Sequence, residues 1–302
     1  GSLLSGILLG GSLMFLLGLV DDIYNLDAKF KLVIQLSIAT IVYLLGVQID
    51  TIFNPFGGVI HLGIFSYPIT LLWIVGISNA VNFIDGVDGL AGSVITVSSI
   101  TLALIAVAVS PAQPITALIA FILAGSMLAF LTFNFNPAKI FMGDSGALML
   151  GFALGVISLY AVARSALFIS LLVPILAAGV PIIDTAFAII RRLLNHRPID
   201  EADKGHIHHQ LLRAGFSQRT TVLIMWGWTF ALALCAVLIT VMEPVYRIPI
   251  VIFIVVLSGF LIIKLNLLGL VLAHHYTPRH RHRKDRSGAK DSAVNHASID
   301  KK

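Results

Sequence analysis

The sequence predicts an all-α polytopic membrane protein with about nine transmembrane helices. Of its 302 residues, 58% are hydrophobic and only 12% are charged, and its mean hydropathy is +0.96. A soluble protein of this length needs more polar surface than this composition supplies. The single cysteine excludes an intramolecular disulfide, and the alternating strands of an outer-membrane barrel are absent.

Nine apolar segments are long enough to cross a bilayer as helices, which takes about 20 residues each. We expect helices because backbone polar groups in lipid must be satisfied within their own segment. Between the second and third segments, residues 51–67 carry a Gly-Gly turn between short alternating runs, which predicts a small hairpin outside the membrane. The nine segments are 3–20, 32–49, 68–84, 90–110, 115–133, 146–163, 166–190, 221–242 and 248–272.

Basic residues mark one side of these nine spans. Nearly all of the 20 lysines and arginines lie in the connections of one side or in the C-terminal tail, the exceptions being Arg164, Arg247 and Lys264. The positive-inside rule makes that side cytoplasmic. We therefore expect a transmembrane domain over 1–273, which begins outside the cell, and a basic, disordered cytoplasmic tail over 274–302.

Four polar segments all fall in the connections of this cytoplasmic side. The connections of the opposite side, by contrast, are short and nearly free of ionisable groups. The gathering of the polar segments on one side predicts one site at the cytoplasmic membrane surface. The segments are VDDIYNLDAKFK (20–31), NAVNFIDGVDGLAG (79–92), FNFNPAKIFMGDSGAL (133–148) and RRLLNHRPIDEADKGHIHHQLLRAGFSQRT (191–220).

The side chains of these segments are typical of phosphoryl transfer. Carboxylates beside a bilayer are costly unless they are paired or bind cations, and Mg²⁺ is commonly held by one or two carboxylates plus substrate phosphates. Histidines and lysines suit phosphate oxygens. The residues alone thus indicate a membrane enzyme that acts on a phosphorylated, nucleotide-like substrate. The five carboxylates on which this interpretation rests are Asp21, Asp22, Asp85, Asp88 and Asp144.

Each segment also has a structural interpretation. An Asp-Asp pair can be a solvated helix boundary, HIHH can be a solvated turn, and two amides at Asn-x-x-Asn share a helix face and can join helices. Asp184, within the seventh span, fits a buried hydrogen bond as well as a catalytic role. A transporter of an anionic substrate is the rival from another class, although no internal repeat is visible; a membrane scaffold would not need these side chains.

In their order and composition, the four segments resemble those of the polyprenyl-phosphate N-acetylhexosamine-1-phosphate transferases (glycosyltransferase family 4). The resemblance covers roughly residues 10–240 and departs at Ala147, where the family commonly has serine. It implies about eleven spans in full-length relatives, so two would precede this chain. HIHH resembles the WecA/TagO branch, which uses UDP-N-acetylglucosamine, whereas the related MraY branch, which uses UDP-MurNAc-pentapeptide, usually carries three consecutive histidines.

The resemblance implies transfer of N-acetylglucosamine-1-phosphate from UDP-GlcNAc to undecaprenyl phosphate, with release of UMP, in the bacterial cytoplasmic membrane. The product would initiate a cell-envelope polysaccharide such as teichoic acid or O-antigen, and which polymer follows is left open. The expected cofactor is Mg²⁺, with Mn²⁺ as a substitute. A homodimer is expected from the superfamily, and no nucleic acid partner is expected.

The resemblance also assigns roles. Asp144 is the first candidate as a Mg²⁺ ligand and Asn82 the second. Asp21 or Asp22 would orient or deprotonate the lipid phosphate. Direct attack by that phosphate is favoured over a covalent aspartyl intermediate, for which Asp144 is the competing nucleophile, because a metal-bound carboxylate is a poor nucleophile. The expected substrate contacts are Phe141 with uracil, Asn79, Asp85 and Asp88 in the nucleotide pocket, Asn25 and Lys31 with sugar or phosphate, and His206, His208 and His209 with the phosphates.

Overall fold

The structure is a computed structural model that describes residues 2–53, 59–109, 112–162, 175–176, 178–194 and 206–264. The chain divides into two compact units, Gly1–Phe260 and Leu261–Lys302. Of the second unit, only the last residues of one helix are described. The tail predicted over 274–302 lies outside the described residues.

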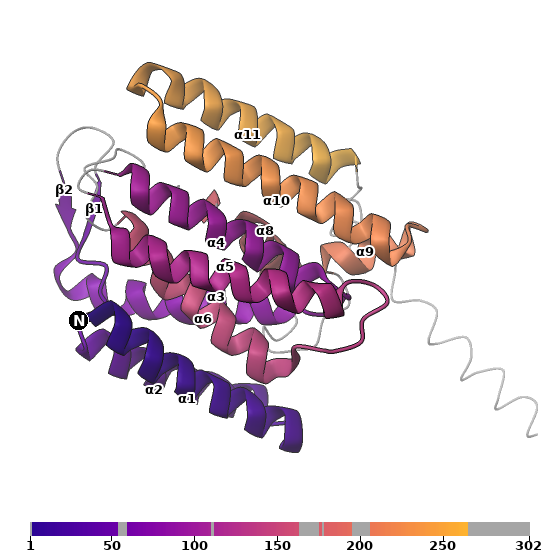
Figure 1. Cartoon of the computed structure of the whole chain (residues 1–302), viewed down its shortest axis with the longest axis horizontal. Coiled ribbons are helices and arrows are strands. Elements are labelled where there is room, and N and C mark those ends of the chain that lie inside the picture. The colour runs from indigo at the N-terminus through magenta and orange to yellow at the C-terminus, as the bar shows by residue number, and fades with distance from the viewer. Residues whose placement is uncertain are drawn as a thin grey trace, which may run out of the picture. The chain divides into compact units, whose positions relative to one another are not determined.

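The first unit is a bundle of long helices with one small hairpin (Figure 1). The long helices are α1 (Ser2–Tyr24), α2 (Ala28–Leu44), α3 (Ser66–Ile84), α4 (Leu90–Ala108), α5 (Pro114–Asn134), α6 (Gly143–Val162), α8 (Gly179–Leu194), α10 (Gln218–Val241) and α11 (Pro244–Lys264). The short elements are β1 (Thr51–Phe53), β2 (Val59–His61), the 3₁₀ helix η1 (Gly63–Phe65) and α9 (Ile207–Arg213).

The predicted fold class, an all-α polytopic membrane protein, is confirmed. In the described part of the chain, 7 helices are long and apolar enough to cross a membrane: α1, α3, α4, α5, α6, α10 and α11. The predicted span 32–49 corresponds to α2, which has 17 residues. Of the predicted span 166–190, residues 166–174 and 177 lie outside the described residues, and α8 forms its second half.

The predicted hairpin between the second and third helices is also confirmed. Strand β1 pairs antiparallel with β2, with Thr51 opposite His61 and Ile52 opposite Ile60. The Gly-Gly turn itself falls outside the described residues. The hairpin is joined to the start of α3, where the Ser66 hydroxyl donates to Asp50 at 3.3 Å.

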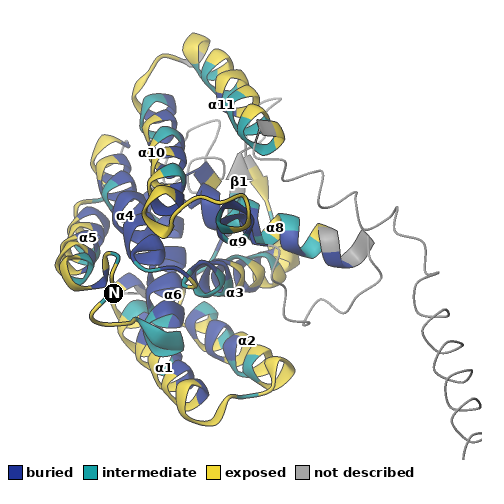
Figure 2. Cartoon of the chain, turned by 90° about the vertical axis from the view of Figure 1, so that its right-hand side faces the viewer, coloured by how far each residue is buried: buried dark blue, intermediate teal, exposed yellow. Residues whose placement is uncertain are grey.

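Helices α4 and α6 form the centre of the bundle. Within their most apolar stretches, 83% of the α4 residues and 72% of the α6 residues are buried, against 6% for α11. Figure 2 shows the same contrast, with α4 and α6 mostly buried and α11 mostly exposed. Helix α6 contacts α1, α3, α4 and α5. Since apolar side chains cover the exposed outer helices, their surfaces suit contact with lipid.

The polar segments meet at one end of the bundle. The long helices run back and forth along its length, so the hairpin lies at one end and α9 lies at the other (Figure 1). The C-terminal end of α1, the turn between α3 and α4, and the connection between α5 and α6 all lie at the end that carries α9. This arrangement brings residues that are more than 100 positions apart into contact, such as Lys31 and Asp144.

Two glycines in α1 provide a matched test of the helix contact that supports this end. A Cβ on Gly18 would lie 2.4 Å from the Asp144 carbonyl oxygen of α6, whereas a Cβ on Gly11 would meet nothing closer than 3.8 Å. We expect Gly18→Ala to lower the free energy of unfolding by about 1–3 kcal/mol, the usual cost of overpacking. Gly11→Ala should be neutral or stabilising by up to about 1 kcal/mol, because alanine favours helix. Unfolding in detergent measures both; equal effects would contradict the close α1–α6 contact.

Candidate active site

A cavity of about 280 Å³ opens at the end of the bundle where the polar segments meet. Its walls come from three of the four predicted segments, which supply the end of α1, the turn after α3, and the connection that leads into α6. The lining residues are Asp22, Asn82, Asp85, Gly86, Val87, Asp88, Asn134, Phe141, Met142, Gly143 and Asp144.

Both carboxylate oxygens of Asp144 have side-chain partners from other helices. Lys31 Nζ lies 2.6 Å from its Oδ2 atom, and Asn82 Nδ2 donates to its Oδ1 atom at 2.8 Å. Lys31 also contacts Asp21 in a short ion pair, and Asp21 accepts a hydrogen bond from the Leu26 backbone at 2.8 Å. With only 14% of its side chain exposed, Lys31 bridges two carboxylates, and a charged hydrogen bond in so sheltered a place is strong.

Asp22 binds the backbone of α6. The amide of Asp144 donates to Asp22 Oδ1 at 2.8 Å, and the amide of Ser145 donates to Oδ2 at 3.1 Å. The first amides of a helix lack partners within it, and a carboxylate there also favours the helix dipole. Gly143 allows this approach, because its φ is +67° and a Cβ there would lie 2.8 Å from Asp22. Asp22 therefore fixes the point from which Asp144 projects.

Asp85 is the carboxylate with spare binding capacity. It ends α3 and lines the cavity, and no residue in the described part of the chain donates a hydrogen bond to its side chain. Burial raises the pKa of Asp85 to about 7, and the negative charges of Asp144 and Asp22 add to that effect. Four carboxylates thus line the cavity, and one of them is pushed toward protonation, so a cation bound there would relieve the repulsion.

Asp88, by contrast, stabilises one wall of the cavity through hydrogen bonds to the connection between α5 and α6. Its Oδ2 atom accepts hydrogen bonds from Asn136 Nδ2 and from the Ala138 backbone amide, both at 3.1 Å. Asn134 makes a second link, since its side chain accepts from Gly89 N at 3.0 Å and donates to the Ile140 carbonyl at 2.8 Å. The turn after α3 is therefore tied to the connection between α5 and α6.

This same connection carries an exposed aromatic ring and is held from its other side. Phe141 is 76% exposed although it lines the cavity. The Asn136 side chain also contacts the Gln218 side chain, and Arg219 Nε donates to the Asn136 carbonyl at 3.2 Å. The start of α10 thus supports the wall that presents Phe141, and Gln218 and Arg219 are residues to which the sequence assigned no role.

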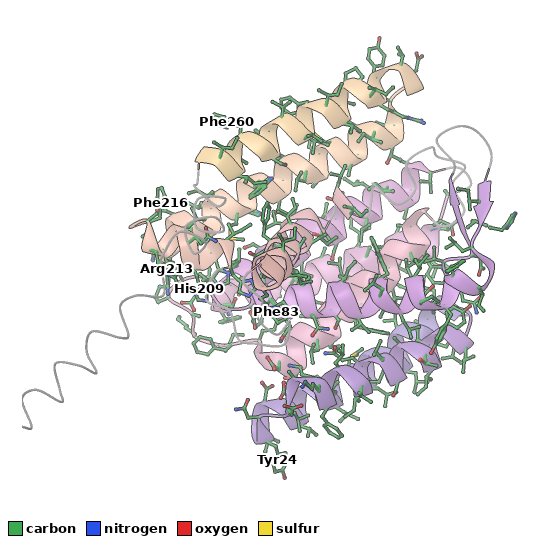
Figure 3. The ribbon with its side chains drawn as sticks, turned by 180° about the vertical axis from the view of Figure 1, so that it is seen from behind. Tyr24, Phe83, His209, Arg213, Phe216 and Phe260 are labelled. Carbon is green, nitrogen blue, oxygen red and sulfur yellow. The ribbon has the colours of Figure 1, made fainter. Side chains whose placement is uncertain are left out.

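The three predicted histidines lie behind this cavity rather than in its lining. His206 precedes α9, and its ring lies parallel to that of His208, with 5.8 Å between the ring centroids. The ring of His209 lies 4.2 Å from that of His208. Figure 3 shows His209 on the same side of the bundle as Phe83, whose ring lies 5.5 Å from His206.

His208 adjoins the cavity through Gly86, where a Cβ would lie 3.0 Å from its Nε2 atom. Its side chain is 1% exposed, and neither ring nitrogen has a hydrogen-bond partner among the described residues. Burial lowers the pKa of His208 to about 4, an effect to which the neighbouring His209 adds and which Asp184 opposes. His208 is therefore a neutral imidazole next to the cavity wall.

Two predicted substrate contacts lie away from the cavity lining. Asn25 is exposed in the turn after α1, at a positive φ of 53°. Asn79 pairs with Gln35 of α2: Asn79 Nδ2 donates to Gln35 Oε1 at 2.7 Å, and Gln35 Nε2 donates to Asn79 Oδ1 at 3.3 Å. Gln35 is fully buried, and the signal that could have identified it is a single amide within an apolar span.

The cavity fits a cation although it is not a ready-made cage. Among the residues that the structure describes, no three His, Cys, Asp or Glu side chains group as a metal site. Mg²⁺ needs no such cage, since it commonly uses one or two carboxylates and completes its shell with water and phosphates. Asp85 lines the cavity together with Asp22 and Asp144, and its pKa is raised first by burial and then by their two negative charges, an arrangement that suits a bound cation.

Comparison with known proteins identifies the family of this chain. The profile of glycosyl transferase family 4 matches residues 4–162. The chain belongs to this family. The predicted membership of the polyprenyl-phosphate N-acetylhexosamine-1-phosphate transferase superfamily is thereby confirmed, and the names of its relatives agree with it.

Three relatives illustrate the range of the family. A probable undecaprenyl-phosphate N-acetylglucosaminyl 1-phosphate transferase of Bacillus subtilis is 39% identical over 237 residues, which are 78% of this chain and 66% of that protein. A decaprenyl-phosphate N-acetylglucosaminephosphotransferase of Mycolicibacterium smegmatis is 34% identical over 259 residues, 79% of this chain and 64% of that protein. A phospho-N-acetylmuramoyl-pentapeptide-transferase of Halalkalibacterium halodurans is 31% identical over 240 residues, 74% and 70% respectively. The chain spans just under two thirds of the first two.

The raised pKa of Asp85 predicts a pH dependence of stability. The folded protein keeps this proton up to a pH of about 7, whereas the unfolded chain releases it near 3.8. Between these values the folded state binds more protons, so the free energy of unfolding falls as pH rises and levels off above pH 7. Asp85→Asn lacks this component. We expect the variant to gain stability relative to the unmodified protein across this range, measured by unfolding in detergent with EDTA; a difference that does not vary with pH would contradict the assignment.

Proposed function

We propose that this chain transfers N-acetylglucosamine-1-phosphate from UDP-GlcNAc to undecaprenyl phosphate and releases UMP. The observation that carries the proposal is the cavity in which Asp144 is held at the start of α6 between Lys31 and Asn82. The names of the Bacillus subtilis and Mycolicibacterium smegmatis relatives support this reaction class and the GlcNAc sugar.

Mg²⁺ would be held by Asp144, with Asn82 as the second ligand, and Mn²⁺ would substitute. When bound, the metal neutralises the charge of the diphosphate. Lys31, which already lies against Asp144, supplies a second positive charge for the sugar-bearing phosphate. Because Lys31 and Asn82 hold the two oxygens of Asp144 in fixed directions, the carboxylate is positioned before substrate arrives.

The nucleotide would bind against the connection between α5 and α6 and the turn after α3. Phe141 presents an exposed ring there, which suits stacking on uracil. Asp85 has unused acceptor capacity and suits hydrogen bonds to the nucleotide. Asp88 would act indirectly, because its carboxylate holds the connection that carries Phe141. The histidines, with His208 adjoining Gly86, suit contacts with the phosphates.

Direct attack by the lipid phosphate remains the favoured mechanism. Asp21 binds Lys31, and Asp22 binds the backbone of α6. Both carboxylates therefore help to position the site, and neither is available solely as a general base. A strong base is not needed, since a phosphomonoester with a second pKa of about 6 is largely ionised at neutral pH. A covalent aspartyl intermediate is disfavoured because Asp144, as the proposed metal ligand, would be a poor nucleophile.

The membrane setting fits the two substrates. The outer helices expose apolar side chains, along which a polyprenyl chain can approach sideways, while the nucleotide approaches the open end of the bundle from water. We place this end on the cytoplasmic side of the bacterial plasma membrane because the basic residues gather in its connections. A homodimer remains a prediction from the superfamily.

UDP-MurNAc-pentapeptide is the second candidate donor. The Halalkalibacterium halodurans relative bears the name of such an enzyme. The HIHH sequence of this chain, which lacks three consecutive histidines, favours UDP-GlcNAc. A donor panel can therefore decide between the two sugars.

The first test is a transferase assay with membranes that contain the chain. We expect UMP release when undecaprenyl phosphate, Mg²⁺ and UDP-GlcNAc are all present, and none when the lipid is omitted or EDTA is added. UDP-GalNAc and UDP-MurNAc-pentapeptide complete the panel. UMP release only with the pentapeptide donor would replace the proposed sugar. Uptake of an anionic substrate into sealed vesicles without any UMP release would favour the transporter instead.

The second test addresses the metal site. Asp144→Asn removes the charge but keeps the shape, and we expect turnover to fall by about a hundredfold or more, with normal insertion into the membrane. Asp50→Asn, at the hairpin end of the bundle, is the matched control and should retain turnover. Binding of Mn²⁺, followed by electron paramagnetic resonance, should weaken in Asp144→Asn alone. Near-normal turnover and Mn²⁺ binding in this variant would refute the assignment.

A further inference from the structure

A contact between an acid and a histidine lies outside the cavity. Asp184 stands in the middle of α8, and only 1% of its surface is exposed. Its Oδ2 atom lies 3.1 Å from His206 Nδ1, and its Oδ1 atom accepts a hydrogen bond from the Ile207 backbone at 2.7 Å. One buried carboxylate thus holds both the ring of His206 and the first amide of α9.

This contact fixes the protonation pattern of the His206 ring. A carboxylate can only accept, so the hydrogen bond requires the proton of His206 to lie on Nδ1. In the neutral ring, Nε2 is then left as an acceptor. Because Oδ1 of the same carboxylate is committed to Ile207, the orientation of Asp184 is also fixed, and the ring of His206 has one preferred position.

From His206 the positioning extends to the cavity wall. The rings of His206 and His208 are parallel within 2°, and both side chains are buried. His208 has two ring nitrogens without a hydrogen-bond partner in the described part of the chain, and Nε2 faces Gly86 of the cavity lining. No described residue holds the ring of His208 by a hydrogen bond, so its position depends on α9 and on the rings of His209 and His206, whose centroids lie 4.2 and 5.8 Å away.

We propose that Asp184 is a positioning residue for the transfer reaction, which acts through His206 to hold His208 next to the cavity wall at Gly86. The proposal rests on the proposed function, because the positioned histidine serves the phosphate substrates. Asp184 itself touches no substrate. Removal of a residue that orients a functional histidine through a hydrogen bond commonly lowers activity tenfold or more.

The purely structural alternative is that Asp184 merely ties α8 to α9. Asp184→Asn separates the two, because the amide keeps the shape and can still accept from Ile207, whereas its NH₂ group would face His206 Nδ1 and require the other tautomer. We expect kcat to fall by about tenfold or more while KM for UDP-GlcNAc changes little, as for an interaction used mainly in the transition state. A wild-type kcat in this variant overturns the proposal.

A double-mutant cycle tests whether the effect passes through His206. If it does, adding Asp184→Asn to His206→Ala should cost much less than Asp184→Asn costs alone, because the two changes remove the same function. Fully additive losses overturn the proposed route. The matched control is Ser78→Ala, which removes a buried hydrogen bond of 2.9 Å between α3 and the Leu148 carbonyl of α6. It should change stability without changing kcat.

A readout that needs no activity separates this proposal from the proposed function. Deuterium exchange at the imidazole C2 position, followed by mass spectrometry, reports on each histidine separately. We expect faster exchange at His206 and His208 in Asp184→Asn than in the unmodified protein, and no change in Ser78→Ala. Unchanged exchange in Asp184→Asn overturns the positioning role even if the unmodified protein releases UMP. If exchange is faster in Asp184→Asn but the unmodified protein itself releases no UMP, the positioning role stands and only the proposed reaction is contradicted.

Discussion

The capped N-terminus of α6 is the fixed point of this molecule. Asp22 of α1 accepts from two consecutive amides there, Asp144 projects from the same turn, and Lys31 and Asn82 bind its two oxygens from α2 and α3. Four helices therefore meet at one carboxylate. These bonds join the ends of α1, α2 and α3 to the start of α6 beside the cavity.

Partnered and unpartnered groups divide the site into scaffold and binding surface. Asp21, Asp22, Asp88, Asp144 and Asp184 all have hydrogen-bond partners within the protein. In the part of the chain that the structure describes, Asp85 and His208 lack such partners, and these are the two groups whose pKa values move to about 7 and about 4. Strongly perturbed pKa values gather where function does, so these two mark the wall that a substrate would contact.

The sequence predicted the fold class better than it predicted the contacts that each aspartate makes. Apolar length gave the spans, and basic residues showed which connections belong together. The adjacent pair Asp21 and Asp22 had to point in different directions, because neighbours on a helix do not share a face. What each meets depends on how other helices pack against α1. Asp21 meets Lys31 of the next helix, and Asp22 meets the start of α6, 122 positions away, and neither contact could be foreseen. For the same reason, Asn79 was predicted in the pocket, while the structure pairs it with Gln35.

The contact between Asp22 and α6 also makes the site sensitive to sliding. Asp22 binds backbone amides, so its two bonds depend on the axial register between two long helices rather than on any particular side chain of α6. One residue of a helix corresponds to about 1.5 Å along its axis, and a shift of α1 by that amount would break both bonds together. Bilayers of different thickness change helix tilt. A change of lipid can therefore shift α1 relative to α6 and alter the position of Asp144. Turnover compared in lipids of graded chain length would reveal this coupling as an optimum, and a flat response would exclude it.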